Sequence, residues 1–141
     1  MTELPRVLAP GIAMGEVLLL DEPLSLWGGL DPATGRLIDV HHPQAGEALA
    51  GRIVAMPAGR GSSSSSYVLA EAARSGVAPA AFLLGEPDGI IALGALVTAE
   101  LYGIHVPVVV LDGETYLGLA TGLHIEVRAS SGRGVALTAV G

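Results

Sequence analysis

The chain has 141 residues, the size of one ordinary domain, and we expect a single domain spanning 1–141. Half of the residues are hydrophobic and only 15% are charged, with a mean hydropathy of +0.57, so we expect a partner to cover part of the apolar surface. The net charge of −7, with seven arginines scattered singly, argues against a nucleic-acid-binding protein, because no basic patch can form along the chain.

The chain also lacks the features of a membrane or secreted protein. Its most apolar segment, 80–101, is interrupted by Glu86, Pro87 and Asp88, and it leaves no uninterrupted apolar stretch of about 20 residues. Residues 1–6 lack the basic start and apolar core of a secretory signal. The absence of cysteine agrees with a reducing compartment, so we expect a cytoplasmic protein.

The first third of the chain is expected to form one strand followed by a long irregular segment. Residues 12–20 are rich in Val, Ile and Leu and are stopped at Pro23. Residues 23–51 are dense in turn formers, yet they contain the single tryptophan, Trp27. Because so long a loop in a small domain is usually functional or an interface, Trp27 is a candidate anchor for a partner, with core filling as the alternative.

The centre of the chain alternates between strands and helices. Residues 53–56 form a short strand, and a glycine- and serine-rich segment at 59–66 leads into good helix formers at 67–75, followed by Gly76. A strand at 80–84, a helix at 90–102 and a strand at 106–111 follow. This β-α-β-α-β pattern predicts parallel strands joined by right-handed crossovers.

The last third is predicted to be a β-hairpin. Residues 123–128 and 134–139 alternate between apolar and polar side chains, and a turn at 130–133 joins them. An α/β centre with terminal β segments is typical of a β/β/α layered domain.

The serine-rich segment between a strand and a helix is the main candidate site. Its glycines allow successive N–H groups to converge on one point, and the following helix adds the positive end of its dipole, so an anion could bind there. Arg60 could hold a carboxylate or a phosphate through two parallel hydrogen bonds. The alternative is a flexible linker whose last serine caps the helix, but linkers seldom interrupt a β-α unit.

His41 and His42 form a second candidate. Adjacent side chains on an extended segment point to opposite sides, so at most one of the two is expected to face a site. The pair lacks the spacing of a zinc motif, and we predict no metal ligand in this chain. The alternative is that one histidine packs or forms local hydrogen bonds.

Three motifs in order carry a resemblance to a known family: EPLSLWGGLDPATG at 22–35, DVHHP at 39–43 and GRGSSSS at 59–65. Together they resemble the small, or swivel, domain of aconitase X proteins. The resemblance covers residues from about 15 to 107. It implies a swivelling β/β/α domain that packs against a large subunit carrying an iron–sulfur cluster, and the two together would form a hydro-lyase.

The resemblance also implies roles for individual residues. The serine loop would remove a proton from the substrate, and because the run is longer than the aconitase Gly-Ser-Ser motif, Ser62, Ser63, Ser64 and Ser65 are all candidates. Ser65, close to the helix start, is preferred. From the chemistry of the residues themselves, the candidate substrate-binding residues are Arg60, Gly61, His41 and His42, with at most one of the two histidines expected to face the site. With no cysteine in this chain, the cluster would lie in the partner, and the chain alone would be inactive.

The family is associated with two substrates, mevalonate 5-phosphate in many archaea and cis-3-hydroxy-L-proline in bacteria. Lysine is absent here, whereas hyperthermophile proteins are rich in lysine, so the composition favours cis-3-hydroxy-L-proline. A non-enzymatic function is the other hypothesis: the chain would be a scaffold or regulatory module that self-assembles when the large subunit is absent.

Overall fold

The structure is a computed structural model, and it describes residues 4–140. The expectation about a signal at residues 1–6 therefore lies partly outside the described residues. The elements in chain order are β1 (Arg6–Ala9), β2 (Gly11–Leu19), β3 (Ile53–Met56), α1 (Ser65–Arg74), β4 (Ala81–Leu84), α2 (Gly89–Tyr102), β5 (Val108–Val110), α3 (Gly113–Leu117), β6 (His124–Ser130) and β7 (Gly134–Ala139). Between residues 4 and 140 no helix has the length and hydropathy needed to span a bilayer.

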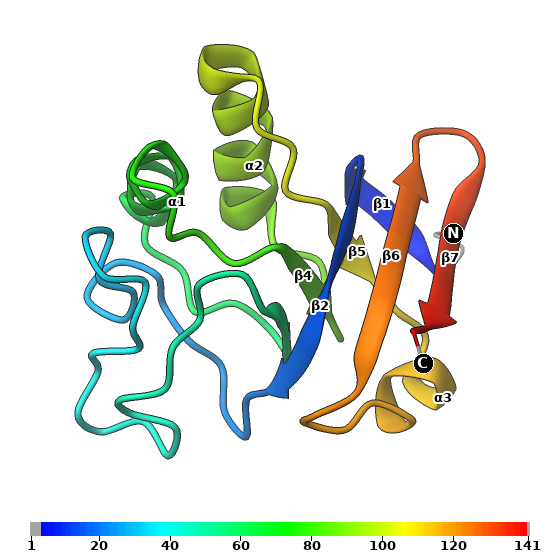
Figure 1. Ribbon diagram of the computed structural model, residues 1–141, viewed down its shortest axis with the longest axis horizontal. Coiled ribbons are helices and arrows are strands. Elements are labelled where there is room, and N and C mark those ends of the chain that lie inside the picture. Colours follow the sequence, from blue (N-terminus) through cyan, green and yellow to red (C-terminus); the bar gives the residue numbers. More distant parts are fainter. Residues whose placement is uncertain (1–3, 141) are drawn as a thin grey trace.

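The seven strands form one curled sheet in the order β1-β5-β4-β3-β2-β6-β7 (Figure 1). The predicted parallel core of β3, β4 and β5 is confirmed, and β2 extends it because it pairs with β3 in parallel. The predicted hairpin of β6 and β7 is also confirmed as antiparallel. The sequence analysis missed the short β1, which pairs antiparallel with β5, and the single-turn helix α3.

The central strands are buried on both faces, which explains why they are almost entirely apolar. Val54 and Phe82 face a core that includes residues of α1 and α2, whereas their neighbours Ile53 and Leu83 face a second core that includes Val127 of β6. Figure 1 shows the two long helices on one side of the central parallel strands, and the β6–β7 end of the curled sheet lies on the other side of them. The predicted β/β/α layering is therefore confirmed.

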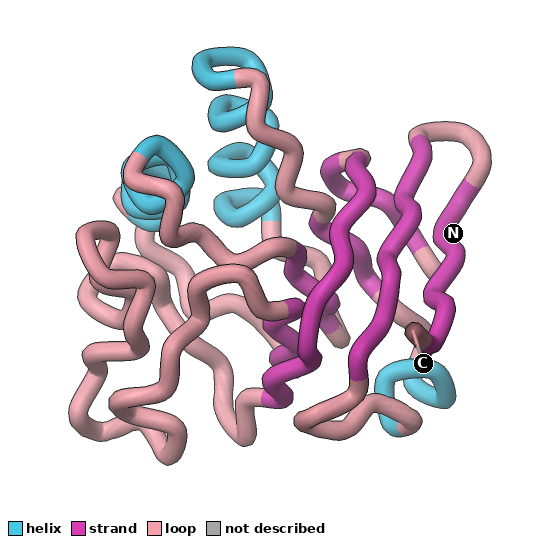
Figure 2. The backbone as a smooth tube through the Cα atoms, viewed as in Figure 1, coloured by secondary structure: helices cyan, strands magenta, loops and turns pink. Residues whose placement is uncertain are grey.

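The segment between β2 and β3, residues 20–52, is irregular as expected, and in Figure 2 it runs as a long loop beside α1. It nevertheless contributes to the helix-side core through buried leucines, namely Leu20, Leu24, Leu26, Leu30, Leu37 and Leu49. This burial holds the segment against the sheet and against α1, next to the serine loop.

Candidate functional site

The candidate site lies where three parallel strands end. Since β2, β3 and β4 run in the same direction, the segments that follow them leave the same edge of the sheet. The segment after β2 and the serine loop after β3 are joined directly: Leu24 and Gly59 form a parallel bridge, and the Arg60 amide donates to the Leu24 carbonyl at 3.3 Å. The segment after β4 adds Asp88 at the start of α2.

Gly59 and Asp88 approach each other very closely. The Asp88 carboxylate caps α2 by accepting the amides of Ile90 and Ile91 at 2.8 and 3.0 Å. A Cβ placed on Gly59 would lie 1.7 Å from Oδ2 of Asp88. Only glycine therefore fits at the first position of the serine loop while this cap is in place.

Helix α1 starts inside the serine run, two residues earlier than the sequence predicts. Ser64 is the N-cap residue, but its side chain accepts no capping hydrogen bond. The Ser65 amide donates to the Ser62 carbonyl at 2.9 Å, and the Ser66 hydroxyl donates to the Ser63 carbonyl at 2.9 Å, so the loop closes into the first turn. The alternative of a flexible linker capped by its last serine does not describe this loop.

The four candidate serines differ strongly in exposure. Ser65 is only 3% exposed. Its Oγ accepts the Trp27 amide at 3.0 Å and lies 3.5 Å from Oγ of Ser25. Ser62 and Ser64 are half-buried, and Ser63 is exposed. Among the four candidates, residues 62–64 are therefore the ones accessible from outside.

Arg60 and Gly61 lie at the rim of the loop and are both exposed. Within residues 4–140, Arg60 forms no ion pair with a carboxylate of the chain, which leaves its guanidinium available for an anionic ligand. A narrow crevice with no room for a water molecule lies between the serine loop and the start of α2. It is lined by Leu24, Leu26, Arg60, Gly61, Ser65, Asp88, Ile90 and Ile91.

The two histidines have different environments, as their adjacent positions predict. His41 is exposed, whereas His42 is 5% exposed. Nδ1 of His42 accepts the Gln44 amide at 3.0 Å, and Nε2 then donates to the Glu22 carbonyl at 3.0 Å. Both ring nitrogens of His42 are used to fasten the segment after β2, and no hydrogen bond among residues 4–140 joins either histidine to the serine loop.

The donor atoms of this chain do not fit an iron–sulfur cluster. The sequence contains no cysteine, and within residues 4–140 no three His, Asp or Glu side chains are grouped as metal ligands. A cysteine-ligated cluster therefore cannot be held by this chain alone.

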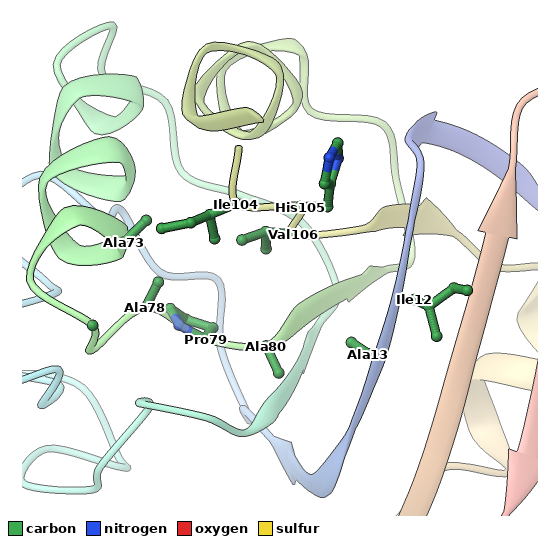
Figure 3. A pocket seen from close by; sticks show the side chains of 10 residues that line it. Ile12, Ala13, Ala73, Ala78, Pro79, Ala80, Ile104, His105 and Val106 are labelled. Carbon is green, nitrogen blue, oxygen red and sulfur yellow. The ribbon is translucent and has the colours of Figure 1, made fainter. Parts of the chain in front are cut away.

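A larger pocket of about 320 Å³ opens at the other end of the sheet, between α1, the segment before β5 and β2 (Figure 3). Its walls are built from small and aliphatic side chains, including Ala73, Ala80, Ile12 and Val106, and His105 is the one lining residue with a polar side chain. This lining lacks the convergent polar groups of a catalytic site. The serine loop remains the better candidate.

The sequence analysis missed two residues that shape the site, Ser25 and Asp88. Asp88 could have been found, because an aspartate directly before an apolar helical segment is a common N-cap signal. Ser25 carries no local signal, because its contact with Ser65 joins residues 40 positions apart. Trp27 is 57% exposed, so the alternative that it fills the core is wrong.

Comparison with known proteins identifies the family. Residues 4–136 match the model of the aconitase X swivel domain. The chain is 51% identical over 116 residues to the cis-3-hydroxy-L-proline dehydratase of Pseudomonas aeruginosa, an alignment that covers 82% of this chain and 20% of that protein. It is 39% identical over 129 residues to the phosphomevalonate dehydratase small subunit of Methanothermobacter thermautotrophicus, covering 91% of this chain and 94% of that subunit.

The alignments thus span about a fifth of the length of the matched cis-3-hydroxy-L-proline dehydratases. Among solved structures, the crystal structure of Thermococcus kodakaraensis aconitase X in its holo-form superposes with a TM-score of 0.82 at 34% identity, covering 97% of this chain and 96% of that one. Sequence and fold agree, and the chain belongs to the aconitase X swivel domain family.

Proposed function

We propose that this chain is the small subunit of an aconitase X-type hydro-lyase, and that its serine loop completes an active site on a large subunit. The observation that carries the proposal is the geometry of the loop. A helix start without a side-chain cap, an Arg60 that forms no ion pair within residues 4–140 and a run of hydroxyls lie together where the parallel strands end. The relatives named as dehydratases and dehydratase subunits supply the type of reaction.

In this proposal the loop binds the acid group of the substrate and removes a proton from its carbon. The guanidinium of Arg60 and the amides at the start of α1, which no side chain caps, would hold the carboxylate. A serine in its alkoxide form would then take the proton, and the C–O bond at the neighbouring carbon would break so that its hydroxyl leaves as hydroxide. The helix dipole contributes at most about 2 kcal/mol, less than two units of pKa, so the large subunit must help to ionise the serine. That subunit would also hold the iron–sulfur cluster, since this chain has no cysteine.

The face that carries the serine loop would contact the large subunit. A groove of about 300 Å³ between α1 and α2 begins at Ser66 and Tyr67, directly after the serine run, and continues to Leu101 and Tyr102. Tyr67 and Leu101 are 64% and 63% exposed, and Trp27 lies beside the loop. A partner that covers the serine loop would bury these side chains as well, which accounts for the apolar surface of so small a domain.

We propose cis-3-hydroxy-L-proline as the substrate, with mevalonate 5-phosphate as the alternative. The higher identity to the Pseudomonas protein, 51% against 39%, supports the first. Charge supports it too, because hydroxyproline carries one carboxylate, whereas mevalonate 5-phosphate adds a phosphate. The serine loop offers a single cationic side chain, Arg60, in a chain of net charge −7.

The test is a dehydration assay on the complex of this chain with the large subunit from the same organism, using both hydroxy acids. We expect turnover of cis-3-hydroxy-L-proline, and we expect Arg60→Ala to raise KM with a smaller effect on kcat. If the complex dehydrated mevalonate 5-phosphate but not cis-3-hydroxy-L-proline, the proposed substrate would be wrong and mevalonate 5-phosphate would take its place. An active complex whose KM is unchanged by Arg60→Ala would refute the role of Arg60 in holding the carboxylate.

A further inference from the structure

The hydrogen bonds around Ser65 separate it from the other serines of the run. We infer that Ser65 is a positioning residue that fastens the Trp27 segment to the start of α1, and that the serine base is one of Ser62, Ser63 and Ser64. The catalytic half of this inference rests on the proposed function. The structural half, a hydrogen bond between residues 27 and 65, can be tested without the large subunit.

Access is the first argument. A general base must come within hydrogen-bond distance of the proton that it removes. Ser65 is 3% exposed, and it is buried by groups of its own chain, including Leu24 and Leu26, with which it lines the same narrow crevice. A substrate held by another subunit would reach Ser63, which is exposed, without moving any part of this domain.

The second argument concerns the turn that Ser65 completes. The amides of Gly29 and Leu30 both donate to the Leu26 carbonyl, at 3.2 and 3.0 Å, so residues 26–30 form a tight turn. The Trp27 amide points out of this turn and donates to Oγ of Ser65 at 3.0 Å. Ser65 therefore satisfies an amide that the turn itself cannot satisfy, and losing such a partner costs free energy.

The turn itself has little freedom to shift. A Cβ on Gly29 would lie 2.1 Å from the Ser25 carbonyl oxygen and 2.6 Å from Cδ1 of Leu24. Because the turn is packed this closely, the bond from Trp27 to Ser65 fixes the start of α1 relative to the segment after β2. The residues just before Ser65 then hold their hydroxyls at a defined place, and the backbone of Trp27 is held against the start of α1.

Amide hydrogen exchange on the full chain tests the structural half. Ser65→Ala removes the acceptor, and we expect the Trp27 amide to exchange roughly threefold to tenfold faster. Ser65→Thr, which keeps a hydroxyl, should restore slow exchange. Ser66→Ala is the matched control, because its hydroxyl donates to Ser63 and does not touch Trp27. Exchange at Trp27 that is unchanged in Ser65→Ala would overturn the inference.

Turnover in the assembled enzyme tests the catalytic half. We expect Ser65→Ala to lower kcat by less than about tenfold with an unchanged pH profile, and one of the alanine variants at 62, 63 or 64 to lose roughly 10²-fold or more. A loss of that size in Ser65→Ala, with all three other variants within tenfold of the parent, would make Ser65 the base and overturn the inference. An inactive parent complex would instead count against the proposed function and leave the exchange result standing.

Discussion

Gly59→Ala is expected to destabilise the domain through Asp88. The new Cβ would lie 1.7 Å from Oδ2 and 2.8 Å from Cγ of Asp88, so the carboxylate must move. Moving it breaks the cap on the Ile90 and Ile91 amides, and losing an N-cap costs about 1 kcal/mol. The backbone of Gly59 is not in the left-handed region, so alanine is otherwise allowed there.

Chemical unfolding of four proteins measures this effect: the parent, Gly59→Ala, Asp88→Ala and the double variant. Once Asp88→Ala has removed the carboxylate, Gly59→Ala should cost nothing or should stabilise by roughly 0.4–1 kcal/mol through the unfolded state. The two changes should therefore be coupled by about 1 kcal/mol or more. Gly89→Ala is the control, because a Cβ there meets no atom within 4 Å, and it should not destabilise. Free-energy changes that add within about 0.4 kcal/mol would refute this reasoning.

Two further changes test other parts of the molecule. Burial raises the pKa of Tyr116 to about 12, and its buried hydroxyl has no hydrogen-bond partner among the described residues. Tyr116→Phe should therefore raise the free energy of unfolding by roughly 1 kcal/mol. The parent should also lose stability as the pH rises from 10 towards 12, because Tyr116 ionises at lower pH in the unfolded chain than in the folded one, and the variant should not show this loss. Trp27→Ala should weaken binding of the large subunit without unfolding the domain, whereas Leu117→Ala, at an 84% exposed position on α3, should not. Equal affinities of these two variants in a titration would exclude Trp27 as an anchor.

The regular elements could be predicted because their signals are local. The strand at Ile53–Met56 is a short apolar run bounded by Pro57, and the predicted helix at 90–102 ends at Gly103, as observed. β1 was missed because it has only four residues and lies between Pro5 and Pro10. Such a strand gives no clear period, and its pairing with β5 depends on residues about 100 positions away.

The sequence predicts where the site lies in the chain, but it does not predict which residues of the serine loop are accessible. A glycine- and serine-rich run between a strand and a helix is visible in the sequence, but the differences among its serines arise from contacts with distant segments. Ser65 is buried because the Trp27 turn lies over the start of α1. Both ring nitrogens of His42 form hydrogen bonds within the loop, with the carbonyl of Glu22 and the amide of Gln44. No spacing in the sequence encodes those partners.

The central claim is that this chain supplies part of an active site that it shares with a larger protein. The most direct measurement is the rate of dehydration of cis-3-hydroxy-L-proline by this chain alone, by the large subunit alone, and by the two together. We predict activity in the combined sample and none in either separate one, with the combined activity lost when Ser62, Ser63 and Ser64 are all changed to alanine. Full activity of the large subunit without this chain, or of the complex with the triple variant, would contradict the claim.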